Sequence, residues 1–431
     1  MRLAWVPLAI LFGWVSGHTS PDRSTEAAGD SLASVWESSM RAQPRYAANE
    51  LRIEAEDAER RALRRDRYPS VEIEGGGDFG QRVRPGEERD EGLAGRGEIL
   101  ARVNWSLLES GRSARQRAVE FRRSGLAAAD AAFDLAFRGE VARAYIGASV
   151  ASERRQLLLA AEPAFEKLAA VVRMRVREGV ESTVALDQIE ESAAARAARL
   201  RAEADAAEGK KLMLALLADR ETVQPLRIDP RPPRAAVSVE TSPALAALRH
   251  EAGERLAEAE ALERTDRWRL DAVGQAGPYF SRAFDRTTEH EYFGGLRFVW
   301  SPDLAGARSS RALAERRRAR ALEADEAGLR RDLSMRVREI DATLGDADAR
   351  TTDWRAAVER AAAAERTARL RWEHGAGSWS DWWEKRERLL EAKLDELDWR
   401  RQTAEMLVEY AEASGRIDDL PAWIGQRSGD L

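Results

Sequence analysis

The sequence has no cysteine and very little histidine. None of its 431 residues is cysteine, and only four are histidine. The absence of thiols excludes disulfide bonds, thiolate metal sites and a lipid attached through an N-terminal cysteine. If the protein is exported, its stability must therefore come from an extensive framework of secondary structure.

Patterns that support catalysis or cofactor binding are also missing. His250, His290 and His374 lie in separate predicted elements, without the HxxxH or HxxE spacing of metal sites. The run from Gly75 to Gly80 lacks the lysine and the serine or threonine of a phosphate-binding loop, and it leads into a charged loop. No nucleophile has a general base beside it. We therefore predict no enzyme activity, no cofactor and no metal site.

Only the N-terminus carries a long apolar run. A short positive start, Met1-Arg2, precedes the apolar stretch from Leu3 to Val15, and Ser16 and Gly17 are small residues suited to cleavage. This pattern is typical of a secretory signal peptide, which we expect at residues 1–17, with a retained anchor as the alternative. No other stretch reaches the ~18 apolar residues of a transmembrane helix, so any membrane-embedded part would consist of strands.

Positive and negative charges are closely interleaved. The chain has 69 lysines and arginines against 75 aspartates and glutamates, and even Arg316-Arg317-Arg318 lies among glutamates. A nucleic-acid-binding protein would carry a basic face, so no nucleic-acid partner is expected. The high content of charged residues, 33%, together with abundant alanine, favours long helices with solvated faces.

The chain contains an internal duplication. Trp105-Ser106 followed by Gly111 is matched by Trp300-Ser301 followed by Gly306, and the turn at Gly179 is matched by one at Gly375. The two tryptophans are 195 residues apart (300 − 105) and the two turn glycines are 196 apart (375 − 179). A period this long is not a solenoid repeat and indicates a duplicated half-protein.

Each half is predicted to contain a helix, two strands, a long helix and a return helix. The first repeat, 31–218, has strands at 68–80 and 98–107, a long helix at 110–177 and a return helix at 182–217. The second repeat, 242–417, has strands at 268–280 and 292–301, a long helix at 308–372 and a return helix at 378–414. A proline-rich linker at 219–241 joins the repeats, and 418–431 is a C-terminal tail. Each long helix would span ~100 Å.

The predicted strands have two different faces. One face is mostly apolar and ends at Trp105 or Trp300, whereas the other face is mostly polar. Such alternation is typical of membrane strands, although a soluble sheet with one wet face shows it too. Because four strands cannot close a barrel, a membrane structure would have to be shared among subunits.

This order of elements resembles the TolC-type outer-membrane efflux protein family over residues 31–417. The strand-to-helix junctions (Trp105, Gly111, Trp300, Gly306) and the hairpin tips (Arg177, Gly179, Ser182, Arg371, Gly375, Ser378) carry the resemblance. It implies a mainly α fold with long coiled-coil hairpins. It also implies a homotrimer in which each subunit gives four strands to a 12-stranded barrel in outer-membrane lipid, with the helical part in the periplasm.

The resemblance further implies a passive exit duct of a tripartite efflux or type I secretion system. Such ducts dock on a periplasmic adaptor and an inner-membrane pump. A soluble periplasmic coiled-coil scaffold without a pore is the alternative, and an adaptor is a third possibility. Adaptors usually carry one hairpin flanked by β-domains, whereas two hairpins are predicted here.

The family's second repeat has two acidic residues, six and nine positions after the tip glycine, that line the tunnel constriction. Asp381 and Glu384 occupy these positions. A threefold ring of them would attract cations, whereas a solvated acidic pair at a helix N-terminus is the alternative. The first repeat departs from the pattern with Ala185, and Gly377 stands where some members carry a basic residue.

Two further groups near the ends of helices have open interpretations. Trp379 and Trp382, with the neighbouring Trp372 and Trp383, could dock an adaptor or pack between helices. We expect that Trp382 and Trp383, on different helix faces, cannot both pack inward. Five arginines precede the first strand and would lie near lipid headgroups or on a solvated helix end: Arg60, Arg61, Arg64, Arg65 and Arg67.

Overall fold

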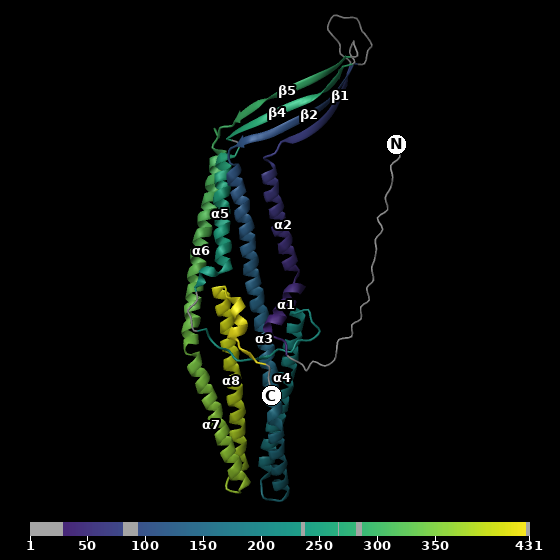
Figure 1. The fold of residues 1–431 in the computed structure, drawn as a ribbon. Helices are drawn as coiled ribbons and strands as arrows, with labels where there is room; N and C mark the ends of the chain where they lie inside the picture. Colours follow the sequence, from purple (N-terminus) through teal and green to yellow (C-terminus); the bar gives the residue numbers. More distant parts are fainter. Residues whose placement is uncertain (1–28, 81–93, 234–237, 266, 282–286, 428–431) are drawn as a thin grey trace, which may run out of the picture.

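The computed structural model describes residues 29–80, 94–233, 238–265, 267–281 and 287–427. The signal peptide expected at 1–17 lies outside the described residues. The molecule is long, with a β-sheet at one end, two helical hairpins at the other, and helices running between them (Figure 1). The predicted class, mainly α with four long strands, is confirmed. Among the described helices, none combines the length and apolar character required to cross a membrane.

The two halves contain corresponding elements. The first half comprises α1 (Leu32–Ala42), α2 (Pro44–Arg65), β1 (Ser70–Gly80), β2 (Ala94–Glu109), α3 (Arg112–Arg177) and α4 (Thr183–Leu217). The second comprises α5 (Pro243–Arg264), β4 (Trp268–Ser281), β5 (Thr287–Trp300), α6 (Ala307–Gly345), α7 (Ala347–Glu373) and α8 (Trp379–Ser414). Short elements lie between and after them: β3 (Arg227–Ile228), η1 (Val239–Thr241), η2 (Ile417–Asp419), α9 (Leu420–Trp423) and β6 (Gln426–Arg427).

The sheet and the helices below it share one lateral order. The strands are antiparallel in the order β1-β2-β4-β5. Beneath them α2 contacts α3, α3 contacts α5, and α5 contacts α6. The outer elements, α2 with β1 and α6 with β5, thus each have a neighbour on one side only within the described chain. The residues of α2 are exposed or half-buried, and Asn49 is its single buried residue.

Two expected single helices are each divided in the structure. The helix expected from Ser31 to Arg67 breaks at Gln43, which is extended because the ring of Pro44 disfavours helical geometry in the preceding residue. The helix expected at 308–372 breaks after Gly345, at Asp346. Glycine is a poor helix former, and the segments on both sides stay buried through Leu344 and Ala347. By contrast, α3 is continuous for 66 residues.

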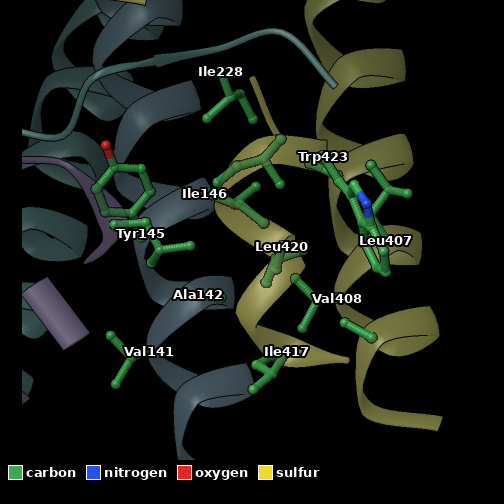
Figure 2. Packing of buried hydrophobic residues seen from close by; sticks show 14 of the residues in the cluster. Val141, Ala142, Tyr145, Ile146, Ile228, Leu407, Val408, Ile417, Leu420 and Trp423 are labelled. Carbon is green, nitrogen blue, oxygen red and sulfur yellow. The ribbon is translucent and has the colours of Figure 1, made fainter. Parts of the chain in front are cut away.

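The largest core lies at mid-height, where the linker and the C-terminal segment pack around α3 and α8. The cluster includes Tyr145 and Ile146 of α3, Leu407 of α8, Ile228 of the linker and Leu420 of α9 (Figure 2). The segment 418–431, expected to be a tail, is folded as far as Arg427. Its apolar turn is buried in this core, and β6 pairs with β3 of the linker.

Tyr145 of α3 hydrogen-bonds to two segments that are distant in the sequence, one at Asp30 and the other at Leu226 of the linker. Its fully buried hydroxyl donates to the carbonyl oxygen of Asp30 at 2.7 Å and accepts from the backbone N–H of Leu226 at 2.8 Å. Ser149, one turn along α3, donates to the carbonyl oxygen of Leu226 at 2.7 Å. Burial raises the pKa of Tyr145, so the hydroxyl remains a neutral donor at physiological pH.

Replacing Tyr145 with phenylalanine should release the linker from α3. The Leu226 N–H and the Asp30 carbonyl would lose their partners, at a cost of ~1–3 kcal/mol for the buried groups. Hydrogen exchange at the Leu226 amide should therefore accelerate by about five- to 150-fold, while Tyr68→Phe, at an exposed position, should leave it unchanged. Unaltered exchange at Leu226 in Tyr145→Phe would show that the hydroxyl does not hold the linker.

Candidate functional site

One face of the sheet is apolar across all four strands and is exposed. The strand register aligns side chains that share this face: Val71 and Ile73 of β1, Ile99, Ala101, Val103 and Trp105 of β2, Ala272 and Ala276 of β4, and Tyr292, Leu296, Phe298 and Trp300 of β5. Large members are strongly solvent-accessible, with Ile73 77% and Phe298 64% exposed. A contiguous exposed apolar surface of this kind marks contact with a protein or a membrane.

The opposite face of the same strands carries compensated charges. Arg102 of β2 binds Glu74 of β1 at 2.6 Å. Asp271 of β4 is almost fully buried between Arg269 at 3.0 Å and Arg297 at 3.1 Å. Charge is therefore confined to one face of the sheet, whereas the described part of the apolar face has none. This separation matches strands that have lipid on one side and water on the other.

Aromatic side chains line the end of the sheet nearest the helices. Trp268 and Trp300 are register partners at the ends of β4 and β5, and Tyr68 directly precedes β1. The indole Nε1 of Trp105 donates to the carbonyl oxygen of Arg67 at 2.7 Å. A row of amphipathic aromatic rings is the arrangement that membrane proteins place at the water–lipid interface.

The predicted junction glycines precede the long helix of each repeat in the same left-handed conformation. Gly111 precedes α3 with φ +89°, and Gly306 precedes α6 with φ +68°. Just beyond each, an arginine reaches back to a strand serine. Arg112 donates to the Ser106 hydroxyl at 3.0 Å, and Arg308 donates to the Ser301 carbonyl at 3.1 Å. The left-handed glycine turns the chain from strand to helix, and the arginine fixes the angle between them.

The two glycines differ in their surroundings, and this difference gives a test. A Cβ on Gly111 would lie 2.7 Å from the backbone nitrogen of Thr265, whereas a Cβ on Gly306 would meet nothing within 4 Å. Gly306→Ala should cost only the left-handed backbone penalty of ~1–2 kcal/mol. Gly111→Ala should add an overpacking cost of ~1–3 kcal/mol.

Thermal unfolding of the two variants in detergent would compare these costs. The Gly111→Ala midpoint should fall clearly below that of Gly306→Ala, which should itself fall below that of the unmodified protein. Equal midpoints would mean that the α3 junction tolerates displacement of Thr265.

The two hairpin tips also share one turn. Gly179 and Gly375 are left-handed, with φ +73° and +72°. The following N–H groups, of Val180 and Ala376, donate to carbonyls five residues earlier at 2.9 Å and 2.8 Å, which closes a Schellman turn. Ser182 and Ser378 then cap the return helices by accepting from backbone N–H groups three residues on. Arg177 and Arg371 lie exposed beside the turns.

Asp381 and Glu384 occupy the first two turns of α8 near the second tip. Asp381 is partly exposed, with the Lys385 ammonium 3.9 Å away, and the exposed Glu384 pairs with Arg388. Each carboxylate thus has a basic partner one helical turn further on. In the first hairpin, Ala185 is buried and offers no carboxylate.

The tryptophans of the second tip are largely packed inside the molecule. Trp382 and Trp383 are only 8% and 7% exposed, so the expectation that both could not pack inward is wrong. They leave different sides of α8, but α7 covers one side and α3 the other. The ring of Trp382 packs at a tilt against that of Trp372, and its Nε1 donates to Glu365 at 3.0 Å, while Trp383 contacts Phe165. Trp379 packs against the same cluster and stays partly exposed.

Arg196 of α4 joins the two hairpins and is not identifiable from its sequence context. Its guanidinium carbon lies 4.0 Å from the ring centre of Phe165 and 4.4 Å from that of Trp383. Glu162 and Glu387 approach at 3.7 Å and 3.8 Å, too far for hydrogen bonds. Burial lowers the pKa of Arg196. Among solvated alanine-rich helices, nothing in the sequence separates this arginine from exposed ones.

Substitutions at Arg196 should separate its packing role from its charge. Arg196→Met keeps a long side chain between the two rings and removes a poorly hydrated charge, so stability should stay within ~1 kcal/mol. Arg196→Ala should leave a gap between the hairpins and cost ~1–3 kcal/mol, with faster hydrogen exchange in α8 near Trp383. Equal losses in both variants would indicate that the charge itself holds the hairpins together.

Comparison with known proteins finds likeness at the level of structure. No protein-family model matches the sequence, and no curated protein matches it significantly. The outer membrane protein VceC of Vibrio cholerae is 14% identical, with 89% of this chain and 96% of that chain covered and a TM-score of 0.74. The outer membrane channel CmeC of Campylobacter jejuni is 13% identical, with 95% and 94% covered and a TM-score of 0.74.

The open state of the outer membrane channel MtrE of Neisseria gonorrhoeae is structurally similar to a comparable degree. It is 16% identical, with 95% of this chain and 96% of that chain covered and a TM-score of 0.71. Likeness at such low identity concerns the fold, and it extends over nearly the whole chain. The resemblance to TolC-type proteins is thereby confirmed for the fold: this chain is built like an outer-membrane channel protein.

Proposed function

We propose that this protein is the outer-membrane exit duct of a tripartite efflux or type I secretion system. The observation that carries the proposal is the sheet, which has an exposed apolar face and a charged opposite face. Lipid would cover the apolar face, with the aromatic row around Trp105 and Trp300 at the interface and the helices in the periplasm. The exposed apolar face counts against the alternative of a soluble periplasmic scaffold, because water would have to cover it.

Two open edges support assembly into a homotrimer. Within the described chain, β1 and β5 each pair with one neighbour, so each presents a row of unpaired backbone groups. In lipid such edges are not tolerated, and pairing of β1 of one copy with β5 of the next would satisfy both. Four strands from each of three copies would give the 12-stranded barrel that the family resemblance implies. The equally open edges of α2 and α6 would close the tunnel below.

At the opposite end, the tips would serve as constriction and docking surface. Asp381 and Glu384 from three copies would surround the mouth with carboxylates and favour cations. The exposed tip residues would contact a periplasmic adaptor, which links the duct to an inner-membrane pump: Arg177, Gly179, Ser182, Arg371, Gly375, Ser378 and Trp379. Buried Trp382 would act there by supporting the tip from within. The duct would do no chemistry and would bind no cofactor.

Reconstitution in a planar lipid bilayer tests the proposal. The mature protein, purified in detergent, should have the native mass of a trimer and should open discrete ion channels in the bilayer. A monomeric protein that remains in aqueous solution without detergent and gives no conductance would refute it.

Neutralising the predicted constriction should alter ion selectivity. Asp381→Asn combined with Glu384→Gln removes two carboxylates per subunit from the mouth, so the reversal potential in a salt gradient should shift towards equal cation and anion permeability. The matched control is Asp187→Asn with Glu190→Gln, which removes two acids of the same spacing from the first hairpin. An unchanged reversal potential in the first variant, or an equal shift in the control, would exclude the assigned role.

A further inference from the structure

Four arginines at the sheet-proximal end of α2 have no carboxylate partner within the described chain. Arg61, Arg64, Arg65 and Arg67 are all exposed, and no ion pair joins them to the residues that the structure describes. Arginines immediately around them are compensated in several ways. Arg60 binds Glu120, Arg123 binds Asp57, and Arg122 binds Glu254. These four arginines, with only Asp66 among them in the sequence, therefore form a locally basic group at this corner.

These arginines share one hollow on the surface. It has a volume of about 800 Å³ and is lined by Arg61, Arg64, Arg65, Arg67, Tyr68 and Gln116. No carboxylate of the described residues lines it. Arg67 donates to the side-chain oxygen of Gln116 at 3.3 Å, which keeps its guanidinium against α3. Forked guanidinium groups are suited to the paired oxygens of a phosphate group.

The hollow lies at the height of the aromatic row. Arg67 and Tyr68 directly precede β1, whose Ser70 pairs with Asn104 of β2. The carbonyl oxygen of Arg67 accepts the Trp105 indole N–H at 2.7 Å. If the apolar face of the sheet is in lipid, the headgroups of the leaflet nearest the helices lie at this level.

We propose that this arginine hollow binds the phosphate of anionic phospholipid headgroups in the leaflet that faces the helices. This inference rests on the proposed membrane function and adds a lipid class and its binding residues. The bound headgroups would fix how deeply β1 and its neighbours sit in the membrane. They would also neutralise a charge cluster that the described part of the chain leaves without ion pairs.

Lipid titration of the detergent-purified protein tests the inference. Short-chain phosphatidylglycerol, short-chain phosphatidylcholine and inorganic phosphate are titrated separately, and binding is measured by calorimetry. Each arginine near an anionic lipid is worth about fivefold in affinity. Phosphatidylglycerol should therefore bind more than tenfold tighter than phosphatidylcholine, and this preference should shrink as salt is raised.

The variant carrying Arg61→Gln, Arg64→Gln, Arg65→Gln and Arg67→Gln should lose the preference. A control that replaces Arg173, Arg199, Arg360 and Arg366 with glutamine should keep it, because the same charge is removed from exposed arginines far from the sheet. Preference that survives in the first variant, or equal binding of both lipids by the unmodified protein, would overturn the inference. Inorganic phosphate binding as tightly as phosphatidylglycerol would overturn the lipid assignment.

Channel recordings separate this inference from the function on which it rests. Conductance of the unmodified protein in a phosphatidylcholine bilayer, together with no headgroup preference, would overturn the lipid site alone. No conductance in bilayers of either composition would overturn the proposed function instead.

Discussion

The structure depends on a sheet that one chain cannot complete. Its four strands leave two edges open, and its apolar face is covered by no other described part of the molecule. Backbone groups at an open edge and apolar side chains in water are both costly. The helices beneath the sheet are in the same situation. No described helix packs against α2 or α6 on the outer side, beneath the free edges of β1 and β5. Under the proposed function, further copies of the chain and a lipid environment would satisfy the sheet and the helices together.

Because the chain is internally duplicated, the same local motifs form the strand-to-helix junctions and the hairpin tips in both halves. A left-handed glycine followed by an arginine that binds a strand serine occurs at both junctions, and a Schellman turn followed by a serine cap occurs at both tips. The copies have since diverged in their surroundings. The junction at Gly111 is crowded by Thr265, whereas that at Gly306 is open. The second long helix is broken at Asp346, whereas α3 continues and contacts both halves.

Features set by local chemistry could be predicted from the sequence, whereas those set by tertiary packing could not. The strands could be predicted from the alternation of apolar and polar residues, and the hairpin tips from their glycines. Both patterns follow directly from backbone geometry. The packing of Trp382 and Trp383 was misjudged because two opposite faces of α8 are both covered, by helices distant in sequence. The folded segment up to Arg427 was missed because its few apolar residues become a core only when β6 meets β3. Arg196 is buried solely through its position between two hairpins.

The sheet end and the hairpin end of the molecule are stabilised by different interactions. The sheet is joined by backbone ladders between all neighbouring strands, with one register shift between β2 and β4 at Ser106 and Leu108. The hairpins meet through an apolar cluster in which the rings of Phe165 and Trp383 are in edge contact. The Arg196 guanidinium lies over both rings, with carboxylates near but not in hydrogen-bonding contact. A buried, incompletely paired charge regains hydration when its surroundings open, which offsets part of the packing that is lost. Separation of α8 from the first hairpin should therefore cost less than it would if a well-packed apolar side chain occupied the position of Arg196.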